Sequence, residues 1–93
     1  MVVLVAILRA KAGQADALKH HLTGLVAPTR AEPGCVQYDL HQGTEDPNTF
    51  LFYEQWKTAQ DLAEHARRPH MKEFGAASKD LVATRELIRL AAA

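Results

Sequence analysis

Residues 32–56 read EPGCVQYDLHQGTEDPNTFLFYEQW, and this stretch decides the predicted fold. From Val36 to His41 apolar and polar residues alternate, which is typical of a strand with one polar face. Residues 42–48 have the composition of a turn. The segment from Phe50 to Trp56 is aromatic and apolar, so it is predicted to be a second strand that forms a hairpin with the first.

The segment before this hairpin predicts a strand and a helix. Residues from Val2 to Arg9 are mostly apolar and β-branched, as in a strand that is covered on both faces. From Ala15 onward, leucines recur at helical spacing while charged residues fall elsewhere. This helix must end before Pro33, which begins a Pro-Gly turn.

The segment after the hairpin predicts two helical pieces and a last strand. Residues 58–67 begin with a Thr and an Asp three positions apart, which resembles a capping box and starts a helix. Pro69 interrupts this helix, and residues 70–77 form a second helical segment. Residues 81–90 are predicted to close the chain as a strand, although helix remains an alternative there because Arg, Glu and Ala favour helices.

The predicted order of elements is βαββαβ, which is the ferredoxin-like α+β arrangement of an antiparallel sheet with helices on one face. Residues 1–93 are expected to form one domain. Because the first strand is apolar on both sides, the other face of the sheet should also be covered. The simplest cover is a second copy, so we expect a homodimer, sheet face against sheet face, that forms a dimeric α+β barrel.

The composition argues against several classes of partner. Eleven Lys and Arg balance eleven Asp and Glu, so the chain lacks the basic surface expected for nucleic acid or an anionic membrane. No apolar run approaches the ~18 residues of a membrane span, and the apolar start lacks the basic region of a signal peptide. The single Cys35 cannot form an internal disulfide, so we expect a cytoplasmic protein.

The second hairpin strand carries the first candidate functional group. Alternation places Phe52, Glu54 and Trp56 on one face of this strand. If helices cover that face, the Glu54 carboxylate is partly desolvated and must pair or take up a proton. His65, at the edge of the apolar stripe of the following helix, is the expected partner of Glu54.

Short motifs occur along the chain in a characteristic order: Glu32-Pro33-Gly34-Cys35, Asp46-Pro47, Tyr53-Glu54-Gln55-Trp56, His65 and Pro69-His70-Met71-Lys72. Together they resemble the antibiotic-biosynthesis monooxygenase family, specifically its small quinol monooxygenases. The resemblance implies a dimeric α+β barrel and a pocket between sheet and helices that Trp56 faces. It also implies oxidation of phenolic or quinol substrates by O₂ without metal, flavin or haem.

Specific roles follow from this resemblance and from the chemistry of the side chains. We expect His65 to be a general base, Glu54 to orient it, and Tyr38 to donate a hydrogen bond to a developing oxyanion. The expected substrate contacts are Trp56, Phe52, His70, Met71 and Phe74. For three of these residues a purely structural role stays open. Glu54 would then form a structural ion pair, Trp56 would belong to the core, and Tyr38 would lie in a dimer interface.

The sequence also leaves alternatives to this function open. Relatives of similar length include haem-degrading enzymes, which the wholly apolar side chains of residues 3–8 argue against, and an isomerase of a phosphorylated signal. No metal site and no cofactor are expected, because His65 and His70 are five residues apart across a proline and no glycine-rich loop opens a helix. A proton-transfer isomerase acting on a small carbonyl compound and a non-catalytic dimer that binds a small aromatic molecule remain alternatives.

Overall fold

A computed structural model describes residues 1–93. It contains four strands and three helices, arranged as the hydrophobic pattern predicts. The elements are β1 (Val2–Ala10), α1 (Ala15–Arg30), β2 (Cys35–Gln42), β3 (Thr49–Trp56), α2 (Ala59–Arg67), α3 (Pro69–Ser78) and β4 (Val82–Leu90). The predicted ferredoxin-like α+β fold is confirmed. The helical alternative for the end of the chain is wrong, since that segment is β4.

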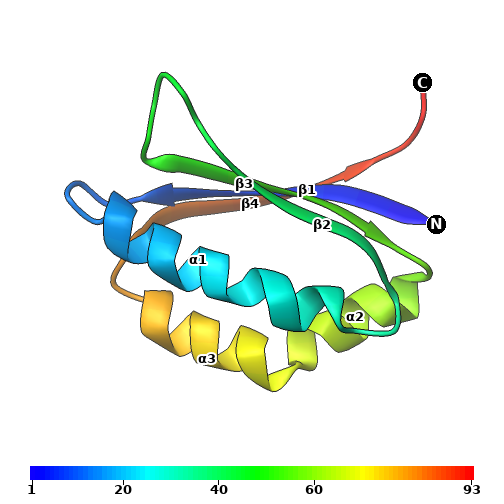
Figure 1. Cartoon of the computed structure of the whole chain (residues 1–93). Helices are drawn as coiled ribbons and strands as arrows, with labels where there is room; N and C mark the ends of the chain where they lie inside the picture. Colours follow the sequence, from blue (N-terminus) through cyan, green and yellow to red (C-terminus); the bar gives the residue numbers. More distant parts are fainter.

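The strands form one antiparallel sheet in the order β2-β3-β1-β4. All three helices lie on the same side of this sheet, and the opposite side carries none (Figure 1). The helix-facing residues form rows across the strands. One row contains Glu54, Leu4 and Arg89, and the next contains Phe52, Ala6 and Leu87.

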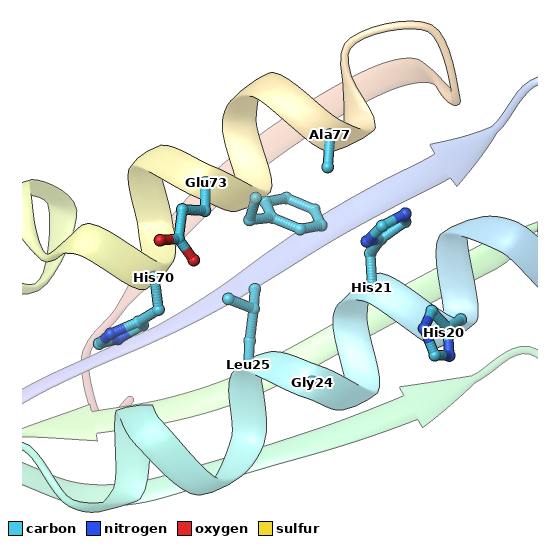
Figure 2. A pocket seen from close by; sticks show the side chains of 8 residues that line it. His20, His21, Gly24, Leu25, His70, Glu73 and Ala77 are labelled. Atoms are coloured by element: carbon cyan, nitrogen blue, oxygen red, sulfur yellow. The ribbon is translucent and has the colours of Figure 1, made fainter.

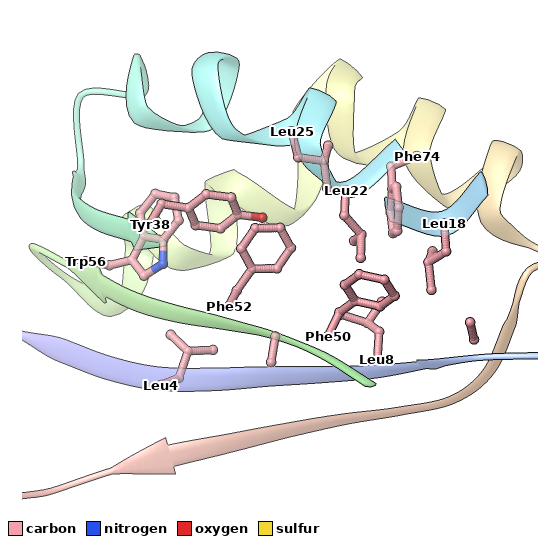
Figure 3. Close-up of a cluster of buried hydrophobic side chains, with 12 residues drawn as sticks. Leu4, Leu8, Leu18, Leu22, Leu25, Tyr38, Phe50, Phe52, Trp56 and Phe74 are labelled. Carbon is pink, nitrogen blue, oxygen red and sulfur yellow. The ribbon is translucent and has the colours of Figure 1, made fainter. Parts of the chain in front are cut away.

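The core lies between the sheet and the helices. Leucines of α1 at helical spacing project onto aromatic side chains of the hairpin (Figure 3). Leu18, Leu22, Phe50 and Trp56 are fully buried. Burial of such side chains contributes roughly 1.5–3 kcal/mol each, so this layer provides much of the driving force for folding.

Two local features position the segments that carry the candidate site. Gly34 lies against the side chain of Asp61, where a Cβ atom would collide, so the start of β2 packs on the first turn of α2. The predicted cap of α2 is confirmed, because the Thr58 hydroxyl accepts a hydrogen bond from the backbone N–H of Asp61 at 3.1 Å. Arg68 is extended (ψ 147°), as Pro69 requires of the residue before it, and this separates α2 from α3.

The helix-free face of the sheet is apolar at its centre. Val3, Val5 and Ile7 of β1 are only half-buried there, and Ile88 and Leu90 of β4 are exposed. The sheet is open in the single chain, so the closed barrel and the dimer stay predictions. None of the helices combines the length and the apolar character that crossing a bilayer requires.

Candidate active site

A cavity of about 510 Å³ lies between the helix-facing side of the sheet and helices α2 and α3. Fourteen of its 19 lining residues are hydrophobic, which is typical of small-molecule sites that fix orientation with a few polar groups. The polar or charged lining side chains are Tyr38, Glu54, His65, Arg85 and Arg89.

The small side chain of Ala6 helps to create this space. Ala6 lies in the middle row of the sheet between Phe52 and Leu87, where a larger residue would fill the volume above β1. Leu87 lines the cavity and yet is 65% exposed, so β4 forms the exposed wall of the cavity. A ligand therefore has apolar surface on the sheet side and an approach along β4.

Behind one wall of the cavity, three side chains converge on the carboxylate of Glu32. Its Oε2 atom lies 2.7 Å from Nδ1 of His65 and 2.9 Å from Nε2 of His70. Its Oε1 atom accepts a longer hydrogen bond, 3.3 Å, from Nε of Arg68. Glu32 and His65 are only 6% and 5% exposed, so this carboxylate is paired within the protein rather than solvated.

The turns of the fold bring these residues together. Glu32 lies in the turn between α1 and β2, which packs against α2 through Gly34. His65 occupies the last turn of α2, and His70 the first turn of α3 beyond the bend at Pro69. Both imidazoles can therefore reach the same carboxylate, although they lie on different helices.

The Glu32 carboxylate fixes the tautomer of His65. An ionised carboxylate only accepts hydrogen bonds, so Nδ1 of His65 carries the proton and Nε2 keeps its lone pair. Burial lowers the pKa of His65 below its usual value, and the hydrogen bond with Glu32 opposes this only in part. The imidazole is thus neutral at pH 7 and can accept a proton, and His65 is one of the residues that line the cavity.

The predicted pairing of Glu54 with His65 is wrong. Nε1 of Trp56 donates a hydrogen bond to Oε1 of Glu54 at 3.0 Å, and Glu32 takes the place beside His65. The cause is local: Glu54 and Trp56 are two residues apart on one strand face, so the indole N–H is the nearest donor. Burial raises the pKa of Glu54 to about 7, despite the opposing effect of the Trp56 hydrogen bond.

This raised pKa predicts a pH-dependent cost to stability. A carboxyl group with a folded-state pKa above its unfolded value favours folding below pH ~4.5, and this contribution is lost as pH rises through about 7. Glu54→Gln keeps an oxygen for the Trp56 N–H and cannot ionise. It should stabilise the protein by up to about 3 kcal/mol at pH 8 and by much less at pH 5, measured by urea unfolding. An equal effect at both pH values would show that Glu54 ionises normally.

Tyr38, Phe52, Met71 and Phe74 all line the cavity, as their predicted roles require. The ring of Tyr38 stacks on Phe52 with centroids 4.3 Å apart and lies on the helix side of the sheet, not on its helix-free face. Burial and the nearby Glu54 raise the pKa of Tyr38. Its hydroxyl therefore remains protonated at neutral pH and can donate a hydrogen bond.

Trp56 and His70 do not line the cavity, contrary to their predicted role as substrate contacts. Trp56 is fully buried and packs on His65, with ring centroids 4.6 Å apart, so it supports the imidazole from behind. His70 instead lines a separate surface groove between α1 and α3, where it lies near Glu73 at one end while His21 lies toward the other end, near Ala77 (Figure 2). The proline bend turns His70 toward Glu32 and this groove.

The same cluster is the one group in the chain that could hold a metal ion. Ligand atoms of Glu32, His65 and His70 lie within 4.8 Å of one another, although the sequence spacing argued against a shared site for the two histidines. Here the carboxylate already accepts hydrogen bonds from both imidazoles and from the cationic Arg68. These contacts are those of a hydrogen-bonded network in which the Glu32 carboxylate has its partners without an ion.

The sequence interpretation missed Glu32, Arg85 and Arg89 as site residues. Glu32 stood out in the sequence only as the first residue of the Glu32-Pro33-Gly34-Cys35 motif, and nothing local predicts its contact with α2, which begins more than 25 residues later. The arginines could have been found by alternation, because Arg85, Leu87 and Arg89 share one face of β4.

Comparison with known proteins connects this geometry to one family. A family model described as "Antibiotic biosynthesis monooxygenase" matches residues 1–77. The protein named "Putative monooxygenase YcnE" of Bacillus subtilis is 33% identical over 82 residues, which cover 88% of this chain and 86% of that protein. "Uncharacterized protein sll1783" of Synechocystis is 38% identical over 58 residues, 62% of this chain but only 40% of that protein's length. The crystal structure of PA3566 from Pseudomonas aeruginosa has a TM-score of 0.93 and 38% identity, and the match covers 96% of this chain and 90% of that one.

Proposed function

The chain belongs to the antibiotic biosynthesis monooxygenase family, and we propose that it oxidises a small aromatic hydroxy compound, a quinol or phenol, with O₂. One observation carries this proposal most strongly. A neutral imidazole, His65, is held by a buried carboxylate at the wall of an apolar cavity of suitable size for an aromatic ring. The imidazole can accept a phenolic proton, and the apolar walls can pack against the aromatic ring.

In the proposed reaction, Nε2 of His65 accepts the proton of the substrate hydroxyl, and the phenolate then supplies electrons to O₂. One oxygen atom forms a bond to a ring carbon, and the other leaves as water. For a quinol the balance is quinol plus O₂ to hydroxyquinone plus water, so the substrate itself is the reductant. The positive charge formed on His65 is stabilised by Glu32 at 2.7 Å.

Two further polar groups support this step. Tyr38 is protonated and lines the cavity, so it can donate a hydrogen bond to the phenolate or to the reduced oxygen. Glu54, with a pKa of about 7, can release or take up a proton near neutral pH. Glu32 is a positioning residue, since it acts through His65.

The test is oxygen uptake with a panel of hydroquinones and anthrone-like compounds, with product identity checked by ¹⁸O₂ labelling. Wild type should consume O₂, and Ala6→Leu should lose most of this activity because the added carbons occupy the cavity. Ala76→Leu, on the exposed side of α3, is the matched control and should retain it. Absence of uptake by wild type, or full activity in Ala6→Leu, would contradict the proposal, and turnover without O₂ would favour the isomerase.

We also propose that two chains associate through the helix-free face of the sheet. Val5 pairs with Ile88 there, and both are incompletely buried in the single chain. Val5→Asp should weaken dimerisation by more than about 100-fold, because a carboxylate would be buried in an apolar interface. Light scattering should show a wild-type dimer and a Val5→Asp monomer, whereas Ala76→Asp should remain dimeric. A monomeric wild type would contradict this proposal.

A further inference from the structure

The exposed wall of the cavity carries two arginines that the proposed reaction does not use. Arg85 and Arg89 lie on the helix-facing side of β4, on either side of Leu87, and all three line the cavity. Their Cα atoms are four residues apart on a strand, about 13 Å. Two long cationic side chains thus flank an exposed apolar residue at the place where a ligand would approach.

Neither guanidinium has an anionic partner within the chain. The arginines that form ion pairs are Arg30, Arg67 and Arg68. Glu86 lies between the two β4 arginines in sequence, but alternation places it on the opposite face of the sheet. The only acid that lines the cavity is Glu54. Glu54 and Arg89 belong to the same row of the sheet but lie two strands apart, so their Cα atoms are separated by about 10 Å.

From this arrangement we propose that Arg85 and Arg89 form an anion-binding site, and that the cavity prefers aromatic hydroxy compounds that also carry a carboxylate or phosphate group. The guanidinium fork matches both anions in a bidentate geometry. The ring would pack over Ala6 and against Leu87, and the hydroxyl would point toward His65. The substrate assignment rests on the proposed oxygenation, whereas the anion site itself does not.

Other cations of the chain are less suited to this role. Arg68 already donates to Glu32, and Arg67 pairs with Glu64 on the exposed side of α2. Lys72 is exposed and does not line the cavity. Arg85 and Arg89 are therefore the cations that combine free donors with contact to the apolar space.

The experiment measures binding by titration calorimetry without O₂, so that no turnover occurs. The probes are hydroquinone, 2,5-dihydroxybenzoate and 4-hydroxyphenyl phosphate, which share the phenolic ring and differ in the anionic group. Wild type should bind at least one anionic probe about tenfold more tightly than hydroquinone at low salt, and added salt should reduce this preference. The two anionic probes together distinguish a carboxylate from a phosphate preference.

Arg85→Gln/Arg89→Gln should lose the preference, so that its affinities for hydroquinone and for the anionic probes become equal. Arg67→Gln removes one positive charge away from the cavity and should leave the preference unchanged. No binding, equal affinity of wild type for all three probes, or an unchanged preference in the double variant would overturn the anion site. If wild type shows the preference but no oxygen uptake, the anion site stands and the oxygenation fails.

Discussion

His65→Gln is expected to lower kcat/KM for quinol-dependent oxygen uptake by about 10²–10⁴-fold, the range for loss of a general base. Glutamine keeps polar atoms and a similar volume but cannot take a proton from a phenol near neutral pH. Because burial lowers the pKa of His65, wild-type activity should persist below pH 6.5 and fall only as the imidazole becomes protonated. This acid limb should be absent from the residual activity of the variant.

His41→Gln is the matched control, because His41 is exposed on β2 and lies outside the cavity. It should keep the rate and the pH profile of wild type. Circular dichroism would verify that both variants are folded. If the kcat/KM of His65→Gln equals that of wild type, His65 is not the general base of the reaction.

Glu32→Gln should have the second large effect, because it should lower both the free energy of unfolding and the rate of oxygen uptake. It replaces a buried carboxylate that accepts hydrogen bonds from His65, His70 and Arg68 with an amide that also donates. The expected loss of unfolding free energy is about 2–3 kcal/mol, measured in urea, since at least one donor is left without its charged acceptor. Oxygen uptake should fall by about 10²-fold at a temperature where the variant is folded, because His65 loses the partner that fixes its tautomer.

A role for Glu32 in positioning, rather than in folding alone, has its own signature. Without the carboxylate the pKa of His65 should drop further, so the acid limb of the pH profile should move to lower pH. Glu45→Gln, an exposed position in the β2–β3 turn, is the control and should change neither property. An unchanged acid limb in Glu32→Gln would contradict the contact between Glu32 and His65.

Local patterns were sufficient to predict the elements of this fold. Alternation on the hairpin, leucine spacing in α1 and the Thr58 cap each act within a few residues, and all correspond to observed elements. Alternation placed Phe52 and Glu54 on the same strand face as Trp56, and the family resemblance implied that this face lies under the helices, where both residues are buried. Fold prediction succeeded because these periodic signals agree with one another along most of the chain, and only the segment that forms β4 left both strand and helix open.

The partners of the site residues could not be predicted in the same way. Which carboxylate reaches His65 depends on how the turn at Gly34 packs on α2 and on the bend at Pro69. Two acids, Glu32 and Glu54, were available, and only tertiary packing selects between them. The indole of Trp56 satisfies Glu54 and so leaves His65 to Glu32.

The most direct test of the central claim is a crystal structure of the protein with 2,5-dihydroxybenzoate bound in the absence of O₂. The ring should occupy the cavity above Ala6, with one hydroxyl oxygen within about 3.2 Å of Nε2 of His65 and the carboxylate toward β4. A ligand seated instead in the groove between α1 and α3, or a cavity filled by its own side chains, would contradict the claim that His65 is the base of this site.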